Sequence, residues 1–413
     1  MIPILIYHSI NEPRYEHVWG VLSLPVHVFE TQMAHLRASG MTPITLAAAY
    51  RGMTDPGSLP RRPVVVTLDD GYLDNWLFAM PILERYEIPA TIFPPTSFVD
   101  PTPGLRSRDG VGPGDSASYG FCSFDELRAM EATGLISVES HSDSHAEITS
   151  GAEILDFHHP EGDAYWVYWE LYPERKPFWL NDEYRRQIPL GTPIYAHTYA
   201  MVGRRWTPPE AQVESCRALV RAEGGERFFR KRDWRTALRA VIEESTPDDI
   251  DDPARFESEE EYRARVLHDL RSSRDRLELE LGHPVRFLCW PCGLYDEATR
   301  ELAAEVGYQS TLTCEPISNR PGEGGSLLHR LYFGQDERYL RIRADALLNL
   351  RFCGELDRAH GRWSGKLKTV VANRSMDLWD FLGERTGLNR NPRVVSASGS
   401  PSSLSSRASP NSV

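Results

Sequence analysis

A buried strand that ends in two adjacent carboxylates constrains the fold of this chain more than any other stretch. Residues 64–68 begin with three consecutive valines, and such a run of β-branched residues is typical of a buried strand. Asp69 and Asp70 follow directly, and Gly71 ends the strand. Because neighbouring side chains of an extended segment point to opposite faces, the two carboxylates can serve different tasks. The alternative interpretation is a simple turn, since Asp-Gly is a common turn signal.

Strand-like and helix-like segments alternate along the chain around this strand. The expected strands are residues 2–10, 90–93, 135–140 and 285–290, and the expected helices are 26–39, 75–87, 124–133, 259–281 and 297–306. This alternation is the pattern of a parallel sheet or barrel, so the expected fold class is α/β. Such folds carry their chemistry at the carboxyl ends of the strands, where Asp69 and Asp70 are placed. We interpret residues 44–46 as a short strand or turn.

A pair of histidines follows the expected strand 135–140. His141 and His145 are four residues apart, a spacing that brings both rings to one side if the chain forms a helical turn or a tight loop. Imidazole suits zinc and its first-row neighbours, and three protein ligands with one open position is the catalytic arrangement. Asp70, His141 and His145 would supply those three ligands. Surface or helix-capping roles are the alternative for the histidines.

Charge, cysteine content and hydropathy exclude several classes of protein. A net charge of −13 argues against a nucleic-acid partner, and an apolar content of 41% is enough for a sizeable core. Six cysteines in so long a chain are not a disulfide framework. No apolar run is long enough for a transmembrane helix, and no basic leader precedes Ile2. A cytoplasmic location is therefore expected, with export as the alternative if the start is trimmed.

Two motifs now identify a family. Residues 67–71 resemble the first signature of the polysaccharide deacetylases, the NodB-homology group or carbohydrate esterase family four, and residues 141–145 resemble the second. Residues 4–10 are similar to the first strand of the branch that deacetylates poly-N-acetylglucosamine. The resemblance implies a distorted (β/α)7 barrel in which Asp69 is the base and Asp70, His141 and His145 hold a divalent metal ion. Zinc is the expected metal, with nickel, cobalt or iron as alternatives.

A further stretch bears on the same site. Trp290, Pro291 and Cys292 resemble the third signature, in which the residue after proline donates its backbone N–H to the developing oxyanion, and the family resemblance makes this stretch a substrate-binding element. The alternative is a redox dithiol, because Cys289 and Cys292 form a Cys-x-x-Cys motif, but a thioredoxin-like sequence around it is missing.

The two proton-donor candidates are histidines near opposite ends of the barrel sequence. His329 lies in a Leu-x-His motif that resembles the fifth signature, whose histidine protonates the leaving amine, and Arg330 is the alternative aligned residue. The resemblance also places His8 near the floor of the site, where it would contact substrate. A hydrogen-bonded core histidine is the alternative for His8.

The expected domain organisation is discontinuous. Residues 1–150 and 283–350 would form the barrel, and residues 151–282 an aromatic-rich, mainly helical insertion. A helix is expected over about 337–349, at the end of the barrel sequence. A C-terminal extension over 351–387 would follow it and precede a disordered tail over 388–413. The aromatic residues of 157–180 favour core packing, with stacking on sugar rings as the alternative.

These features together predict a metal-dependent hydrolase that removes N-acetyl groups from an amino-sugar polysaccharide or oligosaccharide, with the carbohydrate substrate as its partner. Two alternatives stay open. The same residues could hydrolyse another non-peptide C–N bond, such as a formamide or a cyclic imide. The chain could instead be a non-catalytic carbohydrate-binding protein, although such a protein has no need of Asp69.

Overall fold

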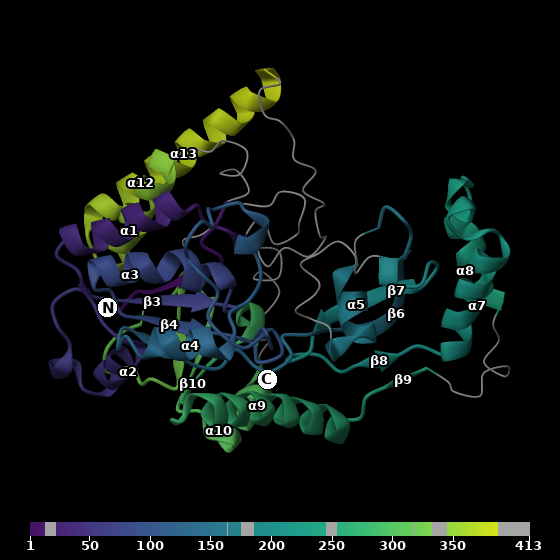
Figure 1. The fold of residues 1–413 in the computed structure, drawn as a ribbon, viewed down its shortest axis with the longest axis horizontal. Coiled ribbons are helices and arrows are strands. Elements are labelled where there is room, and N and C mark those ends of the chain that lie inside the picture. Colours follow the sequence, from purple (N-terminus) through teal and green to yellow (C-terminus); the bar gives the residue numbers. More distant parts are fainter. Residues whose placement is uncertain are drawn as a thin grey trace, which may run out of the picture.

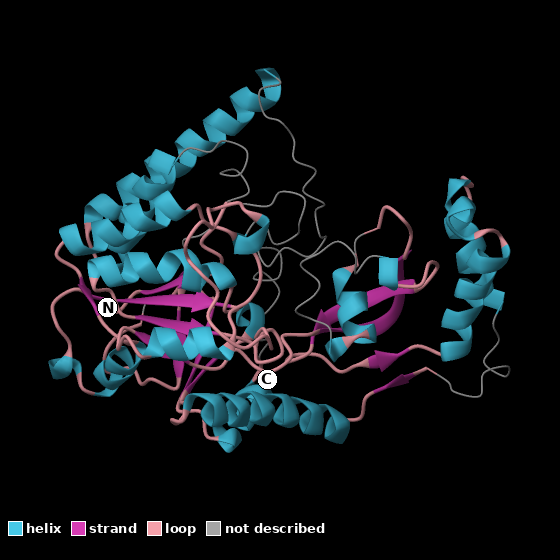
Figure 2. Cartoon of the chain, viewed as in Figure 1, coloured by secondary structure: helices cyan, strands magenta, loops and turns pink. Residues whose placement is uncertain are grey.

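A parallel sheet lies at the centre of the molecule (Figure 1 and Figure 2). The structure is a computed structural model that describes residues 1–12, 22–162, 164–174, 186–244, 254–317, 319–332 and 345–386. The order of the paired strands is β13-β1-β3-β4-β5, β2 also pairs with β3, and all of these pairs are parallel. The strands are β1 (Ile4–Tyr7), β2 (Thr42–Pro43), β3 (Pro63–Asp69), β4 (Ala90–Phe93), β5 (Ile136–Val138) and β13 (Leu331–Tyr332).

A second parallel sheet is joined to the first at both edges. It contains β10 (Phe287–Cys289), β11 (Ser310–Thr313) and β12 (Leu327–His329). Ser140, just beyond β5, pairs in parallel with Leu288, and the backbone N–H of Cys289 donates to the Ser140 carbonyl at 2.8 Å. At the other edge, Arg330 alone separates β12 from β13. The predicted α/β class is confirmed, and this connection agrees with a distorted barrel.

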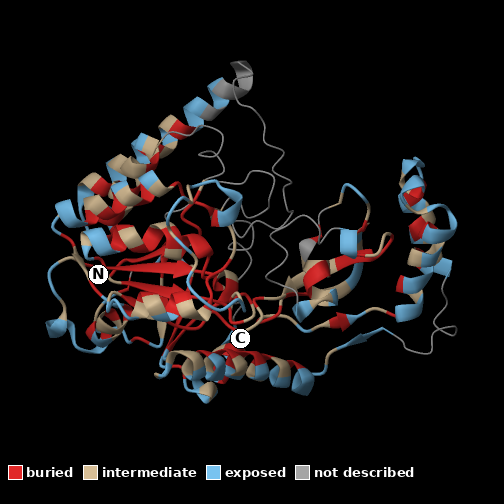
Figure 3. Cartoon of the chain, viewed as in Figure 1, coloured by how far each residue is buried: buried red, intermediate tan, exposed pale blue. Residues whose placement is uncertain are grey.

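Helices cover the outside of the sheets, and burial is concentrated in the strands (Figure 3). Every residue of β3 is buried, as its valine run predicts. Val64 and Val66 belong to one hydrophobic cluster with Phe29 and Met33 of α1. The covering helices are α1 (Val26–Ala38), α2 (Leu46–Thr54), α3 (Met80–Tyr86), α4 (Phe124–Glu131), α9 (Glu259–Leu281) and α10 (Glu297–Val306).

Several helix boundaries agree with the sequence-based expectations. Helices α9 and α10 begin and end at the predicted residues, and Ser258 and Glu261 form a capping box at the start of α9. The helix expected over 75–87 begins as a π-helical turn, Asn75–Ala79, and continues as α3. The change of helical pitch coincides with Pro81, which cannot donate a backbone hydrogen bond.

The expected strand or turn at residues 44–46 is wrong at its C-terminal end. Thr45 is the N-cap of α2, and its hydroxyl accepts a hydrogen bond from the backbone N–H of Ala48 at 3.1 Å. Thr45 has both strand and capping propensity, so the outcome depends on the residues that follow. The three alanines at 47–49 favour a helix.

Residues 151–282 contain strands as well as helices. Strands β6 (Glu147–Phe157) and β7 (Pro193–Tyr199) pair in antiparallel fashion, and the short pair β8 (Trp206–Thr207) and β9 (Arg255–Phe256) leads to the outlying helices (Figure 1). Strand β6 was not expected, because its irregular register and mostly polar sequence hide the alternation of a strand. The helices of this part are α5 (Tyr165–Leu171), α7 (Glu210–Ala222), α8 (Trp234–Glu244) and α9.

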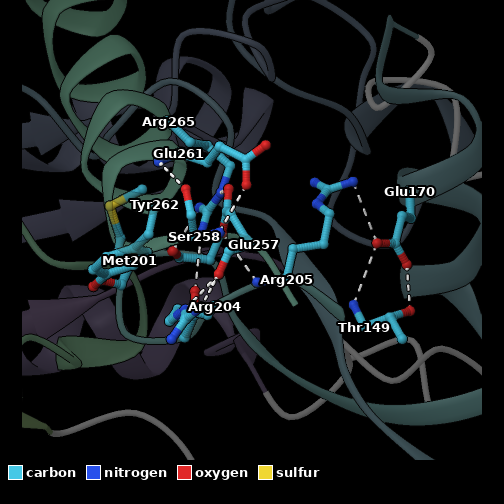
Figure 4. Close-up of polar contacts among 12 residues, drawn as sticks. Thr149, Glu170, Met201, Arg204, Arg205, Glu257, Ser258, Glu261, Tyr262 and Arg265 are labelled. Atoms are coloured by element: carbon cyan, nitrogen blue, oxygen red, sulfur yellow. Dashed lines mark hydrogen bonds and ion pairs between the residues drawn. The ribbon is translucent and has the colours of Figure 1, made fainter. Parts of the chain in front are cut away.

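Arg265 of α9 holds the segment before β8 and the segment after β9 against this helix (Figure 4). Arg265 donates to the carbonyl oxygens of Ala200 and Gly203, both at 2.8 Å, and to the carboxylate of Glu257 at 2.8 and 3.0 Å. Glu257 also accepts from the backbone N–H of Arg205 at 3.0 Å. Since α9 contributes Tyr262, Val266 and Leu270 to the barrel core, the outlying helices are anchored to that core.

The C-terminal part of the described chain is a helical hairpin. It consists of α12 (Asp345–Ala359) and α13 (Trp363–Thr386), and α12 packs against α1. The helix expected over 337–349 lies partly outside the described residues, and the tail 388–413 lies wholly outside them. Among the helices that the structure describes, none has the length and apolar character needed to cross a membrane.

Glu139 supports the weak joint between β5 and β10. Its side chain is 4% exposed, and one carboxylate oxygen accepts the backbone N–H groups of Arg286 and Phe287 at 2.7 and 2.9 Å. Burial raises the pKa of Glu139 from 4.5 to about 7, although the two N–H donors oppose that rise. The carboxyl therefore stays protonated in the folded protein at pH values where the unfolded chain has already ionised it.

We expect this shift to make the joint sensitive to pH. The stability linked to the raised pKa is fully present below about pH 4.5 and is lost as the pH rises towards about 7. In Glu139→Gln this dependence disappears. As the pH rises over this range, the free energy of unfolding of the variant should therefore increase by roughly 1 to 3 kcal/mol relative to that of the wild type. Urea unfolding at both pH values measures the difference. Glu153→Gln, on the exposed part of β6, is the control, and parallel pH profiles for the wild type and Glu139→Gln would contradict the prediction.

Candidate active site

The Asp-Asp-Gly stretch forms a left-handed turn at the end of β3. Asp69 is the last residue of the strand, and Asp70 and Gly71 have φ values of 67° and 66°. A Cβ atom on Gly71 would lie 2.8 Å from Cβ of Pro94, so only glycine fits there without displacement. The turn separates the directions of the two carboxylates, as the alternation along the strand predicts.

The structure brings Asp70, His141 and His145 together. Asp70 Oδ1 lies 3.5 Å from His141 Nε2 and 3.7 Å from His145 Nε2, and all three side chains are buried. The two histidine rings lie 4.9 Å apart, because positive φ values at Ser142 and His145 fold the segment into a tight loop rather than a helix. One carboxylate oxygen and two imidazole nitrogens thus lie within 4.8 Å of one another.

The surroundings of these three residues fit a bound cation. Asp70 Oδ1 is buried and has no hydrogen-bond partner among the residues that the structure describes. Burial, followed by the charge of Asp69, raises the pKa of Asp70 to about 8, so its carboxylate form needs a positive charge nearby. His141 Nδ1 lies 2.8 Å from the carbonyl oxygen of Cys289, and donation there leaves Nε2 free to bind a metal.

Arg330 holds Asp69 through two hydrogen bonds. Its Nη1 and Nη2 donate to the two carboxylate oxygens at 2.7 and 2.8 Å, and both side chains are buried. Burial opposes ionisation of Asp69, but the charges of Arg330 and His141 and the Arg330 hydrogen bonds outweigh it and hold the pKa well below its usual value. Asp69 is therefore an anion with a fixed orientation beside the proposed ligands.

Arg330 rather than His329 makes this contact because consecutive residues of a strand face opposite sides. His329 Nδ1 lies 3.4 Å from Glu315 Oε2, and its side chain is 21% exposed. Sequence reasoning named both residues as alternatives for the same signature. In the structure Arg330 joins the site, and the described contacts of His329 lie with Glu315 and Asn319.

His8 lies within the electrostatic field of the site. Burial lowers the pKa of His8 to about 4; Asp69 opposes this shift, and Arg330 and His141 add to it. Its ring packs edge-on against Tyr332 at 5.9 Å, and its carbonyl oxygen accepts from Asn75 at 2.9 Å. The imidazole is thus held neutral at neutral pH in the absence of a bound cation.

The third predicted stretch forms a strained turn next to the same residues. Cys292 has a φ of 53°, Trp290 and Pro291 are buried, and Cys292 is half-buried. A Cβ atom on Gly293 would lie 2.7 Å from Cβ of Cys314, so the turn packs tightly onto the end of β11. Cys289 Sγ lies 2.8 Å from Arg330 Nη2, and all six cysteines are free thiols. The thiol of Cys289 therefore lies beside Arg330 and Asp69, and it forms no disulfide with Cys292.

Sequence reasoning missed a contribution from the end of β7. Tyr199 pairs across β6 and β7 with Glu147, which follows the ligand candidate His145 by two residues. The Tyr199 hydroxyl lies close enough to the thiol of Cys292 for the two groups to influence each other's pKa. Glu147 also lies 3.1 Å from His197 Nε2. No local motif marks these residues, because the signal lies in a pairing between segments about 50 positions apart, which follows from the register of β6 and β7.

The aromatic residues of the insertion pack behind the site. Phe98 lies 5.7 Å from the ring of His145 and 5.5 Å from that of Trp169, and Tyr168 and Trp169 are almost fully buried. These two rings form part of a small hydrophobic cluster with Tyr72 and Phe121. The expectation of core packing holds for Tyr168 and Trp169, whereas residues 175–180 lie outside the described residues.

Comparisons with known proteins agree with this geometry. Residues 57–158 match the polysaccharide deacetylase family model. A segment of 147 residues, 36% of this chain, is 29% identical to the YxkH protein of Bacillus subtilis (strain 168) and covers 44% of it. A segment of the same length, 35% of this chain, is 28% identical to the poly-beta-1,6-N-acetyl-D-glucosamine N-deacetylase of Escherichia coli (strain K12) and covers 21% of it. The chain thus spans less than half the length of either relative.

The fold extends the similarity beyond the matched segment. A solved structure of a de-N-acetylase from Aggregatibacter actinomycetemcomitans superimposes with a TM-score of 0.50 at 18% identity, covering 80% of this chain and 94% of that one. This likeness concerns the fold, whereas the family match includes Asp69, Asp70, His141 and His145. Through these residues, we identify residues 57–158 as a segment that matches the polysaccharide deacetylase family, within a chain that has the fold of a solved de-N-acetylase.

Proposed function

We propose that this chain is a metal-dependent hydrolase that removes N-acetyl groups from an amino-sugar polysaccharide or oligosaccharide. The observation that carries the proposal is the convergence of Asp70, His141 and His145 beside the anionic Asp69, which is held by Arg330. The named N-deacetylase from Escherichia coli supports N-acetylglucosamine as the type of unit attacked. The Asp69–Arg330 pair favours catalysis over simple carbohydrate binding, because a binding protein gains nothing from an oriented buried base.

Asp70, His141 and His145 would hold the metal ion. Two imidazoles and one carboxylate suit zinc, and nickel, cobalt and iron are the alternatives. When bound, such an ion supplies Lewis acidity that polarises the acetamide carbonyl and acidifies water. The unpartnered Asp70 Oδ1 and the fixed His141 ring support this assignment.

The remaining residues would handle protons and the developing negative charge. Asp69 accepts the proton of the attacking water, and Arg330 keeps its carboxylate in position. The backbone N–H of Cys292 donates to the tetrahedral oxyanion, and Tyr199 fixes the Cys292 side chain. The proton that Asp69 accepts must reach the amine nitrogen, and His8 or His329 would relay it, since a neutral imidazole can accept a proton at one ring nitrogen while it donates one from the other. Acetate and a free amine leave.

We expect the metal to depend on the two histidines. His141→Ala and His145→Ala should lower the zinc content of the purified protein at least about tenfold, because each removes a ligand from a site with three protein donors. Elemental analysis by mass spectrometry after zinc loading measures the content. His268→Ala, an exposed histidine of α9, is the matched control and should retain the metal. Full zinc content in both site variants would contradict the ligand assignment.

We expect Asp69→Asn to separate catalysis from metal binding. The variant should release acetate from N-acetylglucosamine oligomers at least about 100-fold more slowly, since the amide cannot accept the proton, while its metal content stays unchanged. Acetate release with and without a chelator is the measurement, and Asp275→Asn on the exposed side of α9 is the control. Near wild-type turnover by Asp69→Asn would rule out the assigned base.

A further inference from the structure

Helix α13 carries a stripe of exposed apolar side chains. Trp363, Leu367, Val370, Val371 and Leu378 are 81%, 58%, 56%, 45% and 59% exposed. Their spacing of four, three, one and seven residues places them on one face of a helix. Soluble proteins rarely expose so large a continuous apolar area without a partner. We call these five residues the α13 stripe.

The opposite face of α13 is already used within the protein. Ala372 and Met376 are buried, and a Cβ atom on Gly354 of α12 would lie 2.6 Å from Thr369 Oγ1. The turn between the two helices is fixed by Asp357, which accepts from Lys368 Nζ at 2.7 Å. Packing on α12 thus leaves the residues of the α13 stripe exposed, and Figure 3 shows that exposed residues recur along this helix.

The charge around the α13 stripe differs from that of the whole chain. Positions 362–386 contain five basic and three acidic residues, whereas the chain contains 46 basic and 59 acidic residues. Arg374 lies on the same face as the stripe, four residues from both Val370 and Leu378, and Lys366 and Asp377 lie beside it; all three are exposed, and their charges sum to +1. A basic apolar face with tryptophan at its end matches an anionic lipid surface.

Arg374 also argues against a second copy of the chain as the occupant. It lies within the stripe, between Val371 and Leu378, so an apolar interface between two copies would bury its guanidinium with no opposite charge among the stripe residues. Burying an unpaired charge in an apolar interface is unfavourable. The residues that follow Thr386 are rich in serine and offer few large apolar side chains to cover the stripe.

We propose that the α13 stripe binds the surface of a membrane that contains anionic lipids, with the apolar side chains inserted at the headgroup level and Arg374 and Lys366 pairing with lipid phosphates. The helix lies in the plane of the surface, and it does not cross the bilayer. The proposed hydrolase would then act on substrate next to that surface, but the binding itself is independent of the activity.

Vesicle co-sedimentation of the full chain tests the proposal. Binding should be strong to vesicles of an equal mixture of phosphatidylcholine and phosphatidylglycerol and weak to phosphatidylcholine alone. Leu367→Glu and Leu378→Glu should each lower the affinity at least about tenfold, which is the effect expected for losing one inserted leucine. Leu279→Glu is the matched control, because Leu279 of α9 is 78% exposed but lies outside the stripe.

Two outcomes would overturn the proposal. The first is the absence of wild-type binding to the phosphatidylglycerol vesicles, or equal binding by the stripe variants. The second is a dimer, measured by light scattering, that Leu367→Glu converts to a monomer. Arg374→Ala separates a membrane from a second copy as the occupant, since it should weaken vesicle binding, whereas it would strengthen a dimer by removing a buried, unpaired charge.

Discussion

The buried pair between Asp69 and Arg330 is the interaction on which the rest of this structure depends. It connects the end of β3, in the middle of the first sheet, to the single residue that separates β12 from β13. Two charges without access to water are stable only when their hydrogen bonds are complete, and here both carboxylate oxygens and several guanidinium N–H groups have partners. The closure of the sheets and the state of the proposed base therefore depend on the same contact.

The proposed metal ligands depend on a different constraint, which is backbone conformation. Asp70, Ser142 and His145 all have positive φ values, a conformation that costs non-glycine residues free energy. The surrounding fold meets that cost: Pro94 packs on Gly71, and Asp269 of α9 accepts the backbone N–H groups of Asp143 and Ser144 at 2.8 and 3.1 Å. The two loops that carry the proposed ligands are thus held by packing and hydrogen bonds.

The sequence allowed part of the fold and site to be predicted, for reasons that are visible in particular residues. Asp70, His141 and His145 were grouped correctly because they follow strands of one parallel sheet, whose carboxyl ends share an edge. The choice between His329 and Arg330 was left open, since residue type does not tell which of two neighbours on a strand faces inward. Strand β6 and Tyr199 were missed because their pairing depends on an irregular long-range register. The domain boundaries and the general acid stay predictions.

The position of Tyr199 has a consequence for how such enzymes can diverge. Since β7 ends beside the Cys292 turn, the β6–β7 pair contributes to the same side of the proposed site as that turn. A change in the length or tilt of the β6–β7 pair would move the Tyr199 hydroxyl relative to Cys292, the proposed oxyanion donor, while every signature residue stays the same. Evolution can therefore retune this site from a region that lies outside all of its diagnostic motifs, and excision of the pair as a separate module would remove part of the site with it.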